Sequence, residues 1–329
     1  MDLREMVDLR VRGGEQAAPG GAPAVVAGVS VGGERSTAVR GAALAPDSCF
    51  RIASLTKAFT STALLRRLRE NGVALDTPLI ELLADLAPDW RADTGLTVEQ
   101  ILGQVSGLRE CVEASDAAAL GEGPEALHEA ARLVVRGGNE QAPGTRWSYY
   151  NGNYFLVGAV LAALGGASYE TVLRRDLLDP WNLSLTGFDT PREPVAGRDV
   201  GRELPPRDYP RPRRPSGGLW SCVPDLLALG EGLLADRELL DQARRPRTAP
   251  DDPMAYGLGW ALGPSGQMYL NGRLPGYRTA MLLVPDKDLV SVALAAEQTA
   301  LPLLARLLSD VQYPFTGDDL GAAVDAFAA

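Results

Sequence analysis

The chain has 329 residues, 46% of them hydrophobic and 22% charged, and a formal net charge of −10. This composition is typical of one large globular domain or two closely packed ones, and an acidic chain without basic runs is poorly suited to bind nucleic acid or anionic membranes. No apolar stretch is long enough to span a membrane and the amino terminus lacks the apolar core of a secretory signal, so we expect a cytoplasmic protein.

Two residue types limit the chemistry that the chain can perform. The three cysteines, Cys49, Cys111 and Cys222, are widely spaced and form no Cys-x-x-Cys pair, so we expect reduced thiols and no zinc site. The single histidine, His128, lies in a segment with helical apolar spacing and is best explained as a helix residue. A serine enzyme built from this chain would therefore activate its serine without histidine, and we expect neither metal nor cofactor.

The first predicted elements are two strands, over 24–31 and 36–43, joined by a glycine turn. A helix follows from Ser54 to the residue before Gly72, because no proline interrupts this run, Ser54 can cap its start and Gly72 can end it. Ser54 and Lys57 lie on one polar stripe of this helix.

The middle of the chain is predicted to be rich in helices, with the clearest amphipathic pieces at 96–108 and 167–178. The stretch 189–215 is dense in proline and arginine and is predicted to be an irregular connection or lid. Strand character then returns, before a final helix. These last elements are predicted at 256–262, 267–270, 277–284, 289–296 and 301–311.

Strands near both ends with helices between them predict an α/β (α+β) fold, with an antiparallel sheet built from both termini and flanked by helices. We assign residues 1–72 and 255–329 to the sheet domain and residues 73–254 to a mainly helical insert. The active site is expected at their junction.

The Ser-x-x-Lys spacing of Ser54 and Lys57 arises often by chance, and a surface lysine one turn beyond a cap explains it equally well. The place of this pair at the start of the predicted helix strengthens the case for a catalytic role. A hydroxyl at a helix start lies beside unpaired N–H groups that stabilise an anion. A lysine buried among apolar neighbours favours its neutral form and can accept the serine proton.

Seven segments of the chain occur in an order that resembles the class C β-lactamase-like family of penicillin-recognising serine enzymes. The family includes β-lactamases, DD-peptidases, D-amino-acid amidases and peptidases, esterases, and acyltransferases of natural-product pathways. The resemblance spans roughly residues 24 to 296 and implies a β-lactamase/transpeptidase-like fold. Its blocks are RIASLTKAFTSTALL, LDTPLIELL, LTVEQILGQVSGL, APGTRWSYYNGNYFLVG, PSGGLWSCVPDLLAL, AYGLGW and RLPGYRTAMLLVPDKDLVSVAL.

The first two motifs of the family are retained. The resemblance implies that Ser54 is the nucleophile and Lys57 its activator, that Tyr149 is a phenolic acid/base, and that Asn151 hydrogen-bonds Lys57 and the substrate's acyl amide. A phenol near an ammonium has its phenolate favoured, so Tyr149 could shuttle the proton. An aromatic core segment entering a helix is the alternative explanation of this region. Whether tyrosine or lysine is the primary base is left open.

The third motif departs from the family pattern. Counting back from the Pro-Gly step at 275–276 places Leu270, Asn271 and Gly272 where the family has Lys-x-Gly or His-x-Gly. Leu270 therefore replaces the expected cation or imidazole, which points to esters, thioesters or uncharged amides and away from efficient β-lactam hydrolysis. Asn271 or Arg273 could partly replace the lost group.

The resemblance also assigns a backbone role to this motif. Gly272 would let a substrate approach the strand closely, and the N–H of Arg273 would join that of Ser54 in an oxyanion hole. A second departure is Gln104, where the family usually has histidine or a similar residue. We interpret Gln104 as structural.

These features predict a serine hydrolase or acyltransferase that forms an acyl-enzyme on Ser54 with a small-molecule ester, thioester or amide. One alternative is an acyltransferase or cyclase of secondary metabolism that takes its acyl group from a carrier protein. The 189–215 segment could face the acidic carrier or its phosphopantetheine, although a solvated loop explains this segment as well. Another is a catalytically degenerate homologue retained for binding or sensing, although Ser54, Lys57, Tyr149 and Asn151 are all present.

Overall fold

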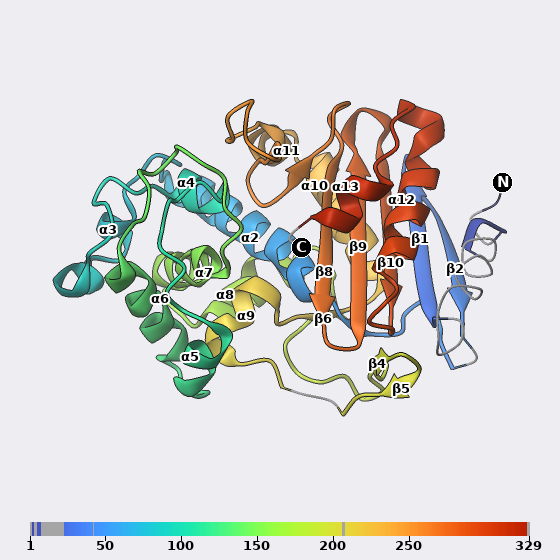
Figure 1. Cartoon of the computed structure of the whole chain (residues 1–329), viewed down its shortest axis with the longest axis horizontal. Coiled ribbons are helices and arrows are strands. Elements are labelled where there is room, and N and C mark those ends of the chain that lie inside the picture. The colour runs from blue at the N-terminus through green and yellow to red at the C-terminus, as the bar shows by residue number, and fades with distance from the viewer. Residues whose placement is uncertain (1, 3–4, 8–22, 42, 206–207, 328–329) are drawn as a thin grey trace.

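The structure is a computed structural model that describes residue 2 and residues 5–7, 23–41, 43–205 and 208–327. Its centre is a six-stranded antiparallel sheet in the order β2-β1-β10-β9-β8-β7 (Figure 1). The strands are β1 (Val25–Val31), β2 (Glu34–Arg40), β7 (Ala261–Leu262), β8 (Met268–Leu274), β9 (Tyr277–Val284) and β10 (Leu289–Ala295). Because β1 pairs with β10 along its whole length, the two ends of the chain are joined in one sheet, which confirms the predicted fold class.

Helices cover both faces of the sheet and form a further layer beside β8 (Figure 1). Helix α12 packs on β9 and β10, and α10 packs on β10 and β1. The helical layer is connected to the sheet by the long helix α2. The α-helices are α2 (Thr56–Asn71), α3 (Leu79–Leu82), α4 (Val98–Leu102), α5 (Ala114–Ala119), α6 (Ala126–Gly137), α7 (Asn151–Gly165), α8 (Tyr169–Leu173), α9 (Arg214–Gly217), α10 (Val223–Ala235), α11 (Arg237–Arg244), α12 (Leu301–Thr316) and α13 (Gly321–Ala326).

Shorter elements complete the fold. A small ladder of β3 with β6 and a hairpin of β4 with β5 lie outside the main sheet. The bounds are β3 (Phe50–Arg51), β4 (Arg198–Asp199), β5 (Arg202–Glu203), β6 (Trp220–Ser221), the 3₁₀ turns η1 (Ala53–Leu55), η2 (Ala84–Asp89), η4 (Arg211–Arg213) and η5 (Pro285–Lys287), and the π turn η3 (Arg174–Leu178). The described residues of the segment 189–215 are thus irregular apart from short elements, as predicted.

Helix α2 ends as predicted but begins differently. Gly72 adopts a left-handed conformation (φ 66°) and its N–H bonds the carbonyls of Arg69 and Leu68, which closes the helix. At the other end, Ser54 is not the capping residue. It lies in η1, α2 starts at Thr56, and no side chain caps either element. The Ser54 hydroxyl bonds the side chains of Lys57 and Tyr149 instead of the first helical N–H groups.

Helix α10 lies inside the segment 73–254 that the sequence assigned to the helical insert, yet it covers the sheet. Two glycines permit this close packing. A Cβ on Gly28 of β1 would lie 2.3 Å from Val223 Cγ1, and a Cβ on Gly230 of α10 would lie 2.6 Å from Val290 Cγ1. The helices that cover the sheet therefore include α10, which the predicted boundaries had placed in the helical insert.

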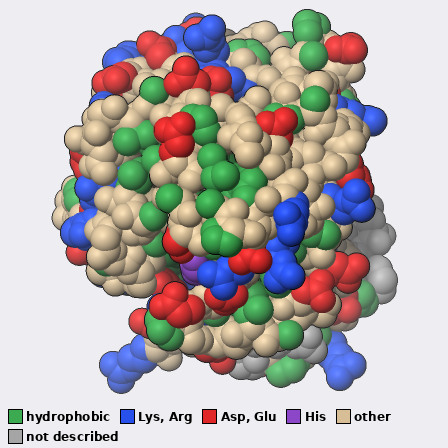
Figure 2. Space-filling view, turned by 90° about the vertical axis from the view of Figure 1, so that its left-hand side faces the viewer, with side chains coloured by type: hydrophobic (Ala, Val, Ile, Leu, Met, Phe, Trp, Pro, Cys, Tyr) green, Lys and Arg blue, Asp and Glu red, His purple; other side chains and the backbone are tan. Residues whose placement is uncertain are grey.

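The outer surface of the helical layer carries interspersed acidic and basic side chains (Figure 2). Within the described residues, no single helix is both long and apolar enough to cross a membrane; only the bent pair formed by residues 151–165 and 169–178 passes such a test together.

The packing of β1 on α10 predicts the effect of a small substitution. Gly28→Ala places a methyl group against the stiff Val223 side chain, and we expect it to lower the free energy of unfolding in urea by about 1–3 kcal/mol. Gly123→Ala is the matched control, because no atom lies within 4 Å of its added Cβ. Equal changes for the two variants would contradict close packing at Gly28.

Candidate active site

Ser54 lies at the edge of the sheet, in the turn between β3 and α2. The preceding residue, Ala53, has a left-handed backbone (φ 48°), which is unusual for a residue with a side chain. The carbonyl of Ile52 accepts a hydrogen bond from Thr279 Oγ1 on β9 at 2.9 Å. The turn that carries Ser54 is thus fixed against the sheet.

The Ser54 hydroxyl is contacted by two functional groups. Tyr149 Oη donates to Ser54 Oγ at 2.8 Å, and Lys57 Nζ lies 3.3 Å from the same oxygen. Ser54 and Tyr149 are partly exposed, whereas Lys57 has no exposed surface. The structure therefore brings together a reachable hydroxyl, a phenol and a buried amine.

Three elements meet at the Lys57 amine. Besides Ser54, Nζ donates to Asn151 Oδ1 at 2.8 Å and to the Ser216 carbonyl at 2.7 Å. Asn151 begins α7 and Ser216 lies in α9, while Lys57 belongs to α2. A neutral amine has two N–H donors and one lone pair, so this arrangement satisfies both donors and leaves the lone pair for Ser54.

Burial, followed by the nearby charge of Arg213, lowers the pKa of Lys57 well below its ordinary value of 10.5. The rings of Tyr149 and Tyr154, at 4.8 Å and 5.3 Å from Nζ, act in the opposite direction by favouring the cation. Such contacts are modest, whereas Lys57 is completely buried. Desolvation therefore dominates, and the neutral amine is favoured.

Tyr149 differs from the expectation drawn from the sequence. Burial raises the pKa of Tyr149 above its usual range, and this outweighs the lowering by its hydrogen bond to Ser54 and by Arg273. The resting phenol is protonated and donates to Ser54. The expectation of a favoured phenolate was wrong because the neighbouring lysine is itself desolvated and favours its uncharged form.

Gln104 positions the segment that carries Tyr149. Its Oε1 accepts hydrogen bonds from the Tyr150 N–H at 3.1 Å and from Asn153 Nδ2 at 2.5 Å, and its carbonyl accepts one from the Ser148 N–H at 2.9 Å. Gln104 is fully buried and adopts a left-handed backbone (φ 56°). These contacts agree with the structural interpretation of this residue.

Gly272 permits the close approach of β8 to the Ser54 turn. A Cβ at this position would lie 2.5 Å from the Ile52 carbonyl oxygen and 2.3 Å from Thr279 Oγ1. Leu274 and Tyr277 are paired across the two-residue turn at 275–276. Along an antiparallel strand, successive residues point their N–H and C=O groups alternately towards the partner strand and away from it. The N–H of Arg273 therefore points away from β9, on the side of the Ser54 turn.

The side chains of the third motif are placed differently from the sequence expectation. Leu270 is fully buried in the core, so it does not line a surface that a substrate can reach in this conformation. Asn271 Nδ2 donates to the carbonyls of Val324 at 2.6 Å and Phe327 at 2.8 Å. Arg273 also donates to a backbone carbonyl of α13. Both candidate replacements for the missing cation are bonded to the chain's own carboxy-terminal region.

Sequence reasoning missed three parts of this site. The Ser216 carbonyl acts through the backbone, which leaves no side-chain pattern, although its segment is one of the ordered blocks. Tyr154 packs on Lys57 and its hydroxyl lies 2.7 Å from Ser61 Oγ, at a position one turn beyond Asn151. Phe327 was not considered, although Leu320, Val324 and Phe327 follow helical apolar spacing and could have indicated a last helix.

A cavity of about 460 Å³ lies on the side of Arg213, and its lining includes Arg51, Tyr209, Arg213, Trp220 and Tyr277. Arg213 is near enough to Lys57 to lower its pKa, which connects this cavity to the amine. The hydroxyl of Tyr209 lies 3.3 Å from the hydroxyl of Ser216. The backbone carbonyl of the same serine accepts the hydrogen bond from Lys57.

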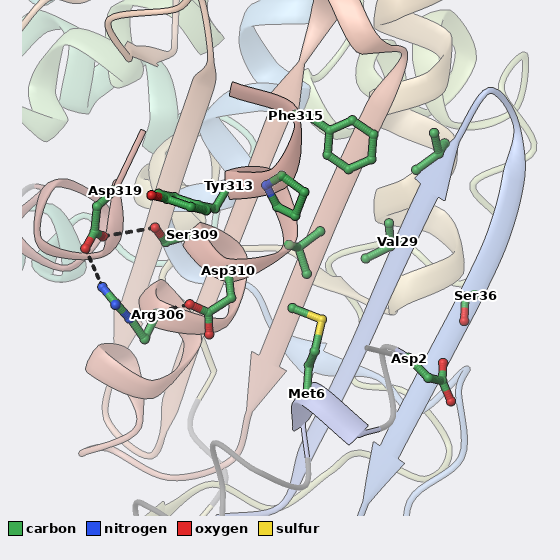
Figure 3. Close-up of a pocket in the computed structure, with 13 residues that line it drawn as sticks. Asp2, Met6, Val29, Ser36, Arg306, Ser309, Asp310, Tyr313, Phe315 and Asp319 are labelled. Carbon is green, nitrogen blue, oxygen red and sulfur yellow. Dashed lines mark hydrogen bonds and ion pairs between the residues drawn. The ribbon is translucent and has the colours of Figure 1, made fainter. Parts of the chain in front are cut away.

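A larger cavity of about 890 Å³ lies elsewhere, between α12 and strands β1 and β2 (Figure 3). Arg306 on its wall pairs with Asp310 and Asp319, and Ser309 also bonds Asp319. Neither cavity is lined by Ser54, Lys57 or Tyr149. The smaller one is the nearer to the site, because its lining includes Arg213, whose charge acts on Lys57.

Within the described part of the chain, no group of three or more histidine, cysteine and acidic side chains could hold a metal ion. His128 Nε2 is 2.7 Å from Asp85 Oδ2 on the helical layer and takes no part in the site. Cys49, Cys111 and Cys222 are free.

The family model of beta-lactamases matches residues 9–308, and the chain therefore belongs to the beta-lactamase family. Protein flp of Staphylococcus aureus (strain N315) is 25% identical over 267 residues, which cover 76% of this chain and 53% of the relative. The chain thus spans about half the length of this curated relative.

Solved structures show the same fold. The octameric penicillin-binding protein homologue from Pyrococcus abyssi superposes with a TM-score of 0.78 at 21% identity, over 97% of this chain and 79% of that one. EstCE1, described as a hydrolase with promiscuous acyltransferase activity, gives a TM-score of 0.75 at 16% identity over 98% of both chains. The fold is that of the β-lactamases and transpeptidases.

The lowered pKa of Lys57 predicts how stability depends on pH. Between this lowered pKa and about 10.5, the unfolded chain binds a proton at Lys57 that the folded chain does not, so the residue makes the free energy of unfolding rise with pH in that window. Lys57→Met removes this contribution. We expect the stability of the variant relative to the natural chain to fall as pH rises through this window towards 10.5, measured by urea unfolding. A constant or rising difference would contradict a lowered pKa.

Proposed function

We propose that the protein is a serine hydrolase that acts through an acyl-enzyme on Ser54. The observation that carries this proposal is the pairing of Ser54 Oγ with a protonated phenol at 2.8 Å and a desolvated amine at 3.3 Å. A serine hydroxyl is a weak nucleophile unless a base accepts its proton. Here the base is available without histidine.

Acylation begins with Lys57. As Ser54 Oγ forms a bond to the substrate's carbonyl carbon, its proton moves to the neutral Lys57 amine and the carbonyl electron pair moves to oxygen. The backbone N–H groups of Ser54 and Arg273 stabilise this oxyanion. The geometry of Lys57 supports it as the primary base, because Asn151 and Ser216 already occupy two N–H donors.

Tyr149 acts in the second half of acylation. When the tetrahedral intermediate collapses, the leaving oxygen or nitrogen takes the phenol proton of Tyr149, and the proton held on Lys57 neutralises the phenolate. Both residues return to their resting forms. Water then attacks the ester on Ser54 by the same steps in reverse order, which releases the acid and the serine hydroxyl.

An uncharged ester, thioester or amide is the substrate class that fits best. Leu270 offers no charge, and the Arg273 guanidinium is bonded to a backbone carbonyl, so the third motif supplies no free cation for a substrate carboxylate. The 460 Å³ cavity, whose lining includes Arg213, has room for an acyl group between Tyr209, Trp220 and Tyr277. The description of EstCE1 as a hydrolase with acyltransferase activity favours transfer to an alcohol or amine as a second candidate reaction. A carrier protein as acyl donor and a cytoplasmic location stay predictions.

An adduct experiment tests the nucleophile. The folded protein is incubated with p-nitrophenyl acetate, an acyl thioester and a chromogenic cephalosporin, and intact-mass spectrometry follows the chain. We expect an added acyl mass with the ester or thioester that is absent in Ser54→Ala. The absence of an adduct with every reagent would contradict the enzyme assignment, and fast turnover of the cephalosporin would contradict the uncharged substrate class.

The approach of β8 to the Ser54 turn gives a second test. Gly272→Ala adds a methyl group against the Ile52 carbonyl, so we expect β8 to move away and the rate of ester turnover to fall about 10²–10³-fold as the oxyanion hole loses its geometry. Gly123→Ala is the control. An unchanged rate in a folded Gly272→Ala protein would show that the Arg273 N–H takes no part.

A further inference from the structure

The carboxy-terminal region of the described chain occupies one side of the active site. Helix α13 and Phe327, here named the 321–327 segment, pack against β8 beside the start of α2 (Figure 1). Tyr269, Asn271 and Arg273 alternate along β8 and all contact this segment. A ligand that approached these three side chains would meet the segment first.

Phe327 lies in a recess with aromatic walls. Its ring is stacked on Tyr256 at a centroid distance of 6.1 Å and meets Tyr149 edge-on at 5.5 Å and Tyr269 edge-on at 6.4 Å. The side chain has no exposed surface. One wall of the recess is therefore Tyr149, the residue whose hydroxyl donates to Ser54.

Polar groups beside the recess bind backbone carbonyls. Asn271 Nδ2 lies within hydrogen-bond distance of the carbonyls of Val324, Asp325 and Phe327, at 2.6, 3.3 and 2.8 Å. The Arg273 guanidinium donates to the Asp325 carbonyl. The carbonyls at a helix end lack helical partners, so these side chains satisfy them. An amide or ester carbonyl of a substrate presents the same acceptor.

The segment depends on tertiary contacts for its position. Helix α13 has six residues, too few to be stable without packing. It packs on α12, and Asn271, Arg273 and the recess attach it to β8. A segment of this kind can exchange between bound and released states, and a ligand that prefers the released state shifts the balance.

We propose that the recess formed by Tyr149, Tyr256 and Tyr269 is a substrate subsite for an aromatic or bulky apolar group next to a carbonyl, and that the 321–327 segment is its intramolecular competitor. The segment presents the two features that such a substrate needs, a benzyl side chain in the recess and carbonyls on Asn271 and Arg273. This inference rests on the proposed function, since it assigns the subsite to the reaction at Ser54.

Ester turnover tests the competition. Phe327→Ala empties the recess, so we expect the ratio of kcat/KM for p-nitrophenyl phenylacetate to that for p-nitrophenyl acetate to rise about tenfold over the natural chain. Phe315→Ala is the matched control, because Phe315 is a 39% exposed ring at the end of α12 and lines the other cavity. An unchanged or lower ratio in Phe327→Ala would overturn the proposal.

Hydrogen exchange provides a test that does not depend on a variant or on turnover. N-acetylphenylalaninamide carries a benzyl group and carbonyls, and we expect it to accelerate amide exchange in residues 321–327 of the natural chain, whereas N-acetylglycinamide leaves the exchange unchanged. Equal exchange with both compounds would overturn the subsite. If Ser54 forms no adduct with any ester while the first compound still releases the segment, the proposed function fails and the recess stands as a binding site.

Discussion

The burial of the Lys57 amine is the constraint on which the site and its surroundings depend. A buried amine needs a hydrogen-bond acceptor for each of its N–H groups. Here α7 supplies the side-chain oxygen of Asn151, and α9 supplies the backbone carbonyl of Ser216. Both elements must therefore dock on α2 for Lys57 to be satisfied. Because the same docking excludes water, it lowers the pKa of the amine and prepares it to accept a proton.

The sheet provides the second half of the site through close backbone approach. Gly272 lets β8 lie against the turn of Ser54, and Thr279 on the neighbouring strand bonds the Ile52 carbonyl in that turn. The serine, the amine and the phenol come from the helical side, while the Arg273 N–H comes from the edge of the sheet. The 321–327 segment covers this edge and places Phe327 against Tyr149, so access to the site is coupled to the position of the chain's own residues.

Much of this arrangement could be predicted from the sequence, because it depends on local patterns. Short β-rich runs bounded by turn residues predicted the strands, Gly72 predicted the end of α2, and the ordered blocks predicted the fold and the grouping of Ser54, Lys57, Tyr149 and Asn151. The errors came from tertiary contacts. Ser54 looked like a helix cap, but its hydroxyl bonds Tyr149. Asn271 looked free to bind substrate, but it bonds Phe327. Whether Tyr149 forms a phenolate depends on how deeply Tyr149 and Lys57 are buried, and the spacing of residues in the sequence does not show this.

The central claim is that Lys57 is a neutral base in the resting protein, and the composition of the chain makes this directly measurable. Lys57 and Lys287 are its two lysines, and Lys287 lies on an exposed turn. Isotopic labelling of lysine therefore gives two side-chain NMR signals, which Lys57→Met assigns. We predict that the Lys57 signal titrates well below pH 10.5. A Lys57 signal that titrates at or above pH 10.5 would contradict the account.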